Sequence, residues 1–312
     1  GPPGHGRRCD GDAGGDCGDD GDEDTAPPAQ GRAPSETGET ATQSIHDRVR
    51  MKEPGLERML FVDAYPRAAF MDHFYATDTG VAELVAGTAV ELGDFAGSAY
   101  TVASLEEVPH APAVTLARTG TVAGHSVSIR KTISLDRGHE DTDGVTVRYV
   151  IEVAESTAVA DGRDFTDVLF APEVNLTLLA GWSHDRYVLV DDVPPPACFL
   201  ADSGTHPGAT SVTLVDETRG LRVRLSWGRA AGLESTHEAR EVTVAEWEAA
   251  IHAVPAEAAA TTLLRHGVVT VSLSEDGFER IYQSTALLPS TPMRLEAGRR
   301  LLATLRLDVS GS

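Results

Sequence analysis

Asp72 and His73 place a carboxylate next to an imidazole, two groups that general acid–base catalysis often uses. A carboxylate beside an imidazole can hold the ring in the orientation of a proton acceptor. Neighbouring residues of an extended strand point to opposite faces, however, which hinders a direct hydrogen bond between them. The sequence therefore favours packing and hydrogen bonding within the fold, or a part in docking another domain, over a catalytic dyad.

Glu173 and Asn175 stand two residues apart in a predicted strand, so both side chains would face the same way. A carboxylate and an amide on one face can hydrogen-bond sugar hydroxyl groups. Trp182, just beyond the strand, can offer an apolar platform to a pyranose ring. These three residues are the candidate carbohydrate-binding residues. The alternative is that Glu173 and Asn175 satisfy loop backbone while Trp182 fills the core.

Phe278, Arg280 and Tyr282 would share one face of another strand, with Gln283 on the other face. Two aromatic rings flanking a guanidinium can stack through cation–π contacts. Such a ladder can bind sugar or dock a second domain, and docking is the favoured interpretation.

The sequence identifies no catalytic residue, metal site or cofactor site. A retaining glycosidase needs two carboxyl groups about 5–5.5 Å apart, and among 48 acidic residues some such pair is expected by chance. An acidic, glycine-rich run at residues 9–24 has the oxygen atoms that Ca²⁺ prefers, but it lacks the roughly 12-residue loop that ends in a bidentate Glu. Solvated low-complexity chain is the favoured interpretation of this run. The histidines show no metal-ligand spacing.

Composition separates the first 43 residues from the rest of the 312-residue chain. They hold ten acidic residues, three arginines and no large aliphatic side chain, which predicts a disordered tail. The net charge of −22 argues against binding nucleic acid or an anionic membrane and is compatible with neutral sugars. There is no apolar run near the roughly 20 residues that span a bilayer. Three cysteines cannot build a disulfide framework, which favours the cytoplasm.

Period-two alternation of apolar and polar residues predicts an all-β sandwich from about residue 98 onward. Residues 127–135 and 145–153 alternate cleanly, with a turn expected at Asp143-Gly144. A helix is expected only at residues 242–254, inside an apparent insertion at about 230–262. Further strands are expected at 169–180, 187–190, 211–215, 221–227, 267–273 and 301–309.

Five segments carry a resemblance to a known family: YPRAAFMDHFY (65–75), GFERIYQST (277–285), SIHDRVRMKEPGLE (44–57), IRKTISL (129–135) and FAPEVNLTLLAG (170–181). Together they resemble the C-terminal β-sandwich of glycoside hydrolase family 57 α-amylases and 4-α-glucanotransferases, over residues 44–230 and 262–308. The resemblance implies a large two-sheet supersandwich, also seen in galactose mutarotases, at residues 44–312. In that family further strands precede the 44–57 segment, whereas here the acidic tail does.

The resemblance also implies that the catalytic carboxylates lie in a barrel outside these residues. The chain is then expected to brace that barrel and to help hold α-1,4-glucan. One alternative is a stand-alone enzyme of mutarotase type, with a His and a Glu as acid and base on the same sandwich. Another is a truncated fragment without a function of its own.

Overall fold

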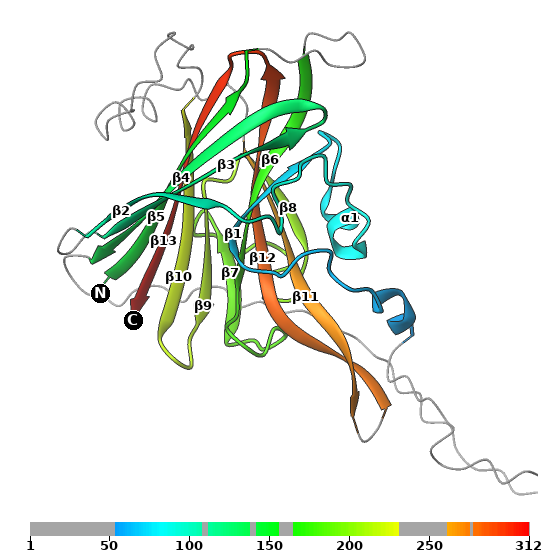
Figure 1. The fold of residues 1–312 in the computed structure, drawn as a ribbon. Coiled ribbons are helices and arrows are strands. Elements are labelled where there is room, and N and C mark those ends of the chain that lie inside the picture. The colour runs from blue at the N-terminus through cyan, green and yellow to red at the C-terminus, as the bar shows by residue number, and fades with distance from the viewer. Residues whose placement is uncertain are drawn as a thin grey trace, which may run out of the picture.

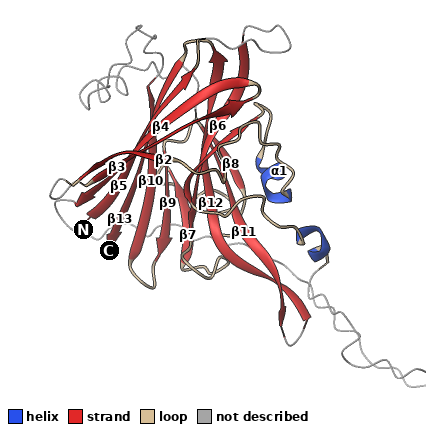
Figure 2. Cartoon of the chain, viewed as in Figure 1, coloured by secondary structure: helices blue, strands red, loops and turns tan. Residues whose placement is uncertain are grey.

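The computed structural model describes residues 54–107, 112–137, 142–155, 165–230, 261–274 and 277–311 (Figure 1). Strands dominate these residues, and both of their helices, η2 (Leu56–Met59) and α1 (Val81–Ala86), are short (Figure 2). In this part of the chain no helix is long and apolar enough to cross a membrane. The predicted tail at 1–43 and the predicted helix at 242–254 lie outside the described residues.

One antiparallel sheet has five strands in the order β1-β6-β12-β11-β8. A β-bulge interrupts the pairing of β1 with β6 between Ala69 and Met71, where Phe70 adopts a φ of 61°. A bulge bends its strand and re-aims the following side chains. The strands are β1 (Ala69–Tyr75), β6 (Phe165–Leu176), β8 (Gly204–Pro207), β11 (Thr262–Ser274) and β12 (Gly277–Glu296).

The other antiparallel sheet has eight strands in the order β2-β3-β4-β5-β13-β10-β9-β7. Its first four strands follow one another in the chain as a meander. The strands are β2 (Thr101–Glu106), β3 (Ala113–Val122), β4 (His125–Arg137), β5 (Thr142–Val153), β7 (Arg186–Val190), β9 (Ser211–Asp216), β10 (Leu221–Ala230) and β13 (Arg300–Gly311).

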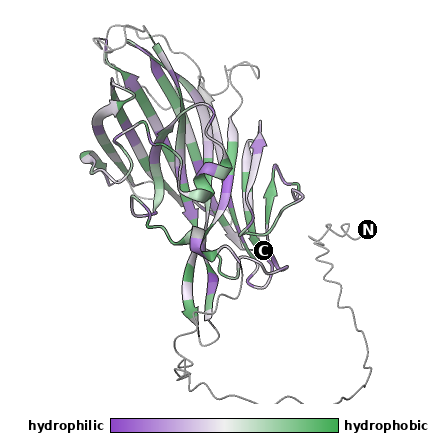
Figure 3. Ribbon diagram, turned by 90° about the vertical axis from the view of Figure 1, so that its right-hand side faces the viewer, coloured by the Kyte–Doolittle hydropathy of each residue, from purple (hydrophilic) through white to green (hydrophobic). Residues whose placement is uncertain are grey.

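The two sheets pack face to face around one apolar core, so the predicted all-β sandwich is confirmed. Hydrophobic and hydrophilic residues alternate along many strands (Figure 3), as expected when each strand buries one face. The core draws on both sheets, with Phe74, Phe170 and Val174 from the first and Ile129, Val147 and Tyr149 from the second.

A second, smaller layer covers the outer face of the five-stranded sheet. It consists of α1 and of residues 54–68. We call residues 54–68, which include η2, the strap. Leu84 of α1 packs on Tyr75, Leu264 and Leu288 of this sheet face, and η2 contacts β11 and β12. The outer face of this sheet is therefore also buried.

The prediction of a turn at Asp143-Gly144 is wrong, because both residues lie in β5 and pair with its neighbouring strands. Gly144 lies opposite Asp136 on β4 and Asp308 on β13. A Cβ at this position would lie 2.8 Å from Asp308 Oδ1 and 2.9 Å from Arg306 Nη2. The glycine therefore makes room for neighbouring side chains that cross the strand, and it marks no turn.

Candidate functional site

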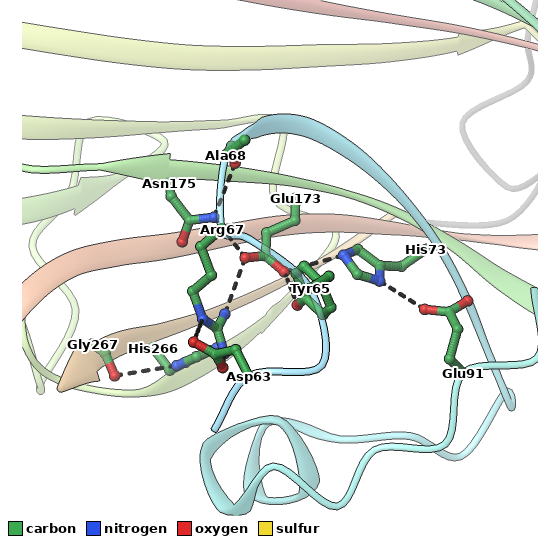
Figure 4. A network of polar contacts seen from close by, with 10 residues as sticks. All are labelled: Asp63, Tyr65, Arg67, Ala68, His73, Glu91, Glu173, Asn175, His266 and Gly267. Atoms are coloured by element: carbon green, nitrogen blue, oxygen red, sulfur yellow. Dashed lines mark hydrogen bonds and ion pairs between the residues drawn. The ribbon is translucent and has the colours of Figure 1, made fainter. Parts of the chain in front are cut away.

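His73 lies on the outer face of β1, between carboxylates from two distant parts of the chain (Figure 4). Its Nδ1 is 2.7 Å from Glu91 Oε2, and its Nε2 is 3.2 Å from Glu173 Oε2. Tyr75 stacks on the imidazole with 5.3 Å between ring centroids. The His73 side chain is 0% exposed and that of Glu173 is 1% exposed. A hydrogen bond thus holds Nδ1, a carboxylate oxygen lies at ion-pair distance from Nε2, and the ring is shielded from solvent.

Glu173 connects the strap to β6. Its Oε2 accepts a hydrogen bond from the Tyr65 hydroxyl at 2.6 Å, and its Oε1 accepts from Arg67 Nη1 at 3.0 Å and from Asn175 Nδ2 at 2.6 Å. Arg67 also pairs with Asp63 within the strap, through Nη2 at 2.7 Å and Nε at 3.0 Å. Both Glu173 oxygens are therefore engaged by side chains of this same chain.

The charges in this network stabilise one another against the cost of burial. Burial alone would lower the pKa of His73, but hydrogen bonds and negative charge from Glu173 and Glu91 raise that pKa to about 9. Burial would raise the pKa of Glu173, but contacts with His73, Tyr65 and Arg67 lower it to about 2. At neutral pH an imidazolium therefore faces carboxylates.

His266 of β11 adds a neutral group beside this network (Figure 4). Its Nδ1 lies 3.2 Å from the carbonyl oxygen of Gly267, and burial lowers its pKa. The lowered pKa keeps His266 uncharged at neutral pH, so the network gains no second cationic histidine here.

Asp72 points the other way, into the space between the sheets. Lys131 Nζ of β4 lies 2.7 Å from Asp72 Oδ2 and 2.8 Å from the carbonyl oxygen of Phe70 at the bulge. The Tyr100 hydroxyl donates to the same carboxylate, and Lys131 Nζ lies 4.3 Å from the Tyr100 ring centroid. Burial, followed by the charge of Asp72, raises the pKa of Tyr149. Asp72 thus links β1 to the opposite sheet.

A third group of residues lies where β6 ends. The pairing of β12 with β6 starts at Thr285, so among the described strands residues 277–283 pair with β11 alone, as a two-stranded ribbon. The Arg280 guanidinium lies 5.5 Å from the Trp182 ring centroid, and Tyr282 meets Trp182 edge to face at 6.4 Å. Trp182 is 43% exposed. This cluster faces solvent, unlike the His73 network.

Comparison with known proteins decides what kind of chain this is. Residues 28–236 and 233–305 match the family model described as "Alpha-amylase/4-alpha-glucanotransferase, C-terminal". The chain belongs to this family. The resemblance stated from the five sequence segments is thereby confirmed, and with it the assignment of the chain as a C-terminal domain of α-amylase/4-α-glucanotransferase type.

Two relatives carry matching names. "Alpha-amylase 1" from Dictyoglomus thermophilum is 26% identical over 274 residues, which cover 88% of this chain and 32% of that protein. A "4-alpha-glucanotransferase" from Thermococcus kodakarensis is 30% identical over 145 residues, which cover 46% of this chain and 19% of that protein. The α-amylase/4-α-glucanotransferase C-terminal domain therefore corresponds to about a third or less of the length of these relatives.

The crystal structure of 4-alpha-glucanotransferase from Thermococcus litoralis shares the fold of this domain. It aligns with a TM-score of 0.52 and 18% sequence identity, over 82% of this chain and 29% of that chain. At this identity the likeness concerns the fold alone.

The candidate sugar-binding residues occupy two different environments in this α-amylase/4-α-glucanotransferase C-terminal domain. Glu173 and Asn175 share a face, as predicted, because the Asn175 amide reaches Glu173 Oε1. Both are held by partners from the strap. Trp182 instead contacts Arg280 and Tyr282 at the solvent-exposed cluster.

The candidate docking residues are divided in the same way. Asp72 and His73 point to opposite faces of β1, as predicted, and both side chains are buried against groups of this chain. Phe278 lies on the ribbon opposite Leu273 and is half-buried. Of the candidates, only the ribbon residues and Trp182 are thus placed to meet a second molecule.

Sequence reasoning missed several partners in these networks. Tyr65 and Arg67 belong to the 65–75 segment that carries the family resemblance, so the segment itself was a signal for them. Glu91 lies outside all five segments, whereas Lys131 belongs to the 129–135 segment and so had the same signal. They reach His73 and Asp72 through tertiary packing, from a loop after α1 and from the opposite sheet.

Proposed function

We propose that this chain is the non-catalytic C-terminal β-sandwich of an α-amylase/4-α-glucanotransferase-type enzyme of glycoside hydrolase family 57, and that it braces a catalytic barrel. The observation that supports this proposal most strongly is the burial and the charge of His73 and Glu173, the pair whose chemistry suits acid–base catalysis. The side chains are 0% and 1% exposed, so a sugar has no access to them in this arrangement. Their pKa values, about 9 and about 2, lie far from neutrality, where acid–base catalysis is most efficient.

The proposal assigns different tasks to the two sets of docking candidates. Asp72 and His73 would stiffen the sandwich from inside, because Asp72 pairs with Lys131 of the opposite sheet and His73 pairs with Glu173 of β6. Phe278 and its neighbour Leu273, which is 68% exposed, would meet the catalytic portion at the ribbon. Exposed apolar side chains on a ribbon that pairs with no further strand among the described residues suit such a contact.

The remaining parts of the proposal concern ligand and compartment. The polymer handled by the whole enzyme would be an α-1,4-glucan, in keeping with the names of the relatives. The proposed compartment is the cytoplasm, and the argument for it is only that three cysteines cannot build a framework of several disulfides.

The first test is catalysis by the purified chain. Maltoheptaose incubated with the wild-type chain should yield neither shorter nor longer maltooligosaccharides when the products are separated by chromatography. A Glu173→Gln variant serves as the comparison. Turnover by the wild type that the variant loses would overturn the non-catalytic assignment.

A mutarotase-type enzyme is the second candidate, and one observation favours it. His73 and Glu173 do form an imidazole–carboxylate pair on the sandwich, as that chemistry requires. Polarimetry of freshly dissolved α-D-glucose separates the two candidates. We expect the rate of the buffer alone, because the pair is buried. A faster rate that Glu173→Gln abolishes would establish the second candidate instead.

A further inference from the structure

We propose that Trp182, Arg280 and Tyr282 form one surface site for an α-1,4-glucan chain, with a pyranose ring stacked on the Trp182 indole. The choice of sugar rests on the function proposed above. The site itself is inferred from the geometry of the exposed cluster. In this cluster Trp182, a candidate sugar-binding residue, contacts Arg280 and Tyr282, two candidate docking residues.

The Trp182 indole is held in place from the protein side. Tyr282 packs against its edge, and the Tyr282 hydroxyl lies 2.7 Å from Thr285 Oγ1. That Thr285 hydroxyl donates in turn to the carbonyl oxygen of Leu200 at 2.8 Å. A platform whose orientation is fixed in advance loses little conformational entropy when a ligand binds.

The backbone that carries Trp182 is equally constrained. A Cβ on Gly181 would lie 2.5 Å from the Tyr282 ring, so the chain approaches that ring more closely than any other residue type allows. The Gly181 carbonyl accepts a hydrogen bond from Ala201 N at 2.9 Å. The orientation of Trp182 is therefore set by packing on both sides of the turn.

Two consecutive residues of the turn before Trp182 have left-handed backbone conformations. Leu179 has a φ of 58° and Ala180 a φ of 45°, although neither is glycine. Such conformations cost free energy and tend to persist where function requires them. Leu179 is 53% exposed, so burial of its side chain does not explain the turn. The strained turn presents Trp182 to solvent.

The chemistry of the cluster matches a neutral sugar. The apolar C–H face of a pyranose stacks on an aromatic ring, and the hydroxyl groups at its rim seek hydrogen-bond donors. The Arg280 guanidinium carbon lies 5.5 Å from the indole centroid, which puts a cationic group beside the ring. The net charge of −22 disfavours an anionic ligand.

The test is a titration of the full chain with maltoheptaose, followed by tryptophan fluorescence and by isothermal titration calorimetry. Trp182→Ala should lower the association constant at least about tenfold, which corresponds to roughly 1.4 kcal/mol. Trp182→Phe should retain part of the affinity, since an aromatic face remains. Leu105→Ser is the matched control, because Leu105 is an exposed apolar residue of β2, in the other sheet and outside the cluster, and the affinity of this variant should equal that of the wild type.

Three outcomes would overturn the proposal: no heat and no fluorescence change with maltoheptaose, binding that Trp182→Ala leaves intact, or an equal loss in Leu105→Ser. Far-ultraviolet circular dichroism of each variant establishes that it is folded. Failure here differs from failure of the proposed function, which depends on turnover by the chain and on Glu173. A chain that neither binds glucan nor catalyses would keep its bracing role and lose the sugar site.

Discussion

At the scale of single residues, His73 is a buried cation held by two carboxylates. An isolated charge in the interior would be neutralised by a shift of its pKa. Here the contacts with Glu91 and Glu173 reverse the effect of burial and keep the imidazole protonated. The charge of His73 therefore contributes to stability, and this contribution depends on pH.

The pH dependence of unfolding follows from the direction of these shifts. His73 has a pKa of about 9 in the folded chain against 6.5 in a model peptide. Its stabilisation is therefore fully present below about pH 6.5 and is lost as the pH rises to about 9. We expect the free energy of unfolding, measured by urea denaturation, to fall by roughly 3 kcal/mol over this interval. Glu173 works in the opposite direction, with stability lost as the pH falls from 4.5 toward 2.

A His73→Gln variant provides the comparison for this prediction. Glutamine can donate to a carboxylate through its amide nitrogen but does not titrate. The variant should be less stable at pH 6 and should lose most of the alkaline slope. An unchanged slope between pH 6.5 and 9 would show that another group is responsible.

At the scale of elements, the turn that joins β6 to Trp182 depends on close packing at one glycine. Gly181→Ala would place a methyl group 2.5 Å from the Tyr282 ring and 3.0 Å from Ala201 Cβ. Relief of this overlap requires movement of the turn, which we expect to destabilise the chain by about 1–3 kcal/mol. Urea denaturation measures the loss, and the tryptophan emission maximum reports the displacement of Trp182.

The control for this variant is Gly311→Ala. A Cβ at Gly311, the last residue of β13, meets no atom within 4 Å. Its stability should stay within about 0.5 kcal/mol of the wild type. Equal effects at the two glycines would contradict the packing argument at Gly181.

The strands themselves could largely be predicted from the sequence, because alternation along β4, β5 and β13 reflects burial of one face. The prediction of a turn at Asp143-Gly144 was wrong because Gly144 makes room for side chains of the neighbouring strand. The site was predicted in part. Spacing along β6 put Glu173 and Asn175 on one face, but Glu91 and Lys131 come from segments that no local pattern connects to β1.

At the scale of the whole molecule, Asp72 and Lys131 join the two sheets through a buried ion pair. The side chains are 0% and 8% exposed. Removal of one partner leaves a buried charge without its counterion, which typically costs about 3–5 kcal/mol. We expect Lys131→Met and Asp72→Leu each to lower the unfolding free energy by this amount. The double variant should lose much less than the sum.

A surface pair gives the control for this cycle. Glu296 pairs with Arg299 at 3.2 Å, with side chains 52% and 47% exposed. Glu296→Ala should change stability by less than about 1 kcal/mol. Additive losses in the Asp72 and Lys131 cycle would show that the two side chains contribute independently and do not link the sheets.

The order of the strands has a consequence for synthesis on the ribosome. Strands β2 to β5 are neighbours in the chain, so they can pair as soon as each leaves the exit tunnel. The segment at 65–75 emerges earlier but must wait for β6, which in turn pairs with β12 close to the C-terminus. Until then its aromatic residues stay unprotected, and contacts of such long sequence separation form slowly. We therefore expect the nascent chain to be most vulnerable to aggregation between the emergence of Tyr65 and that of β12.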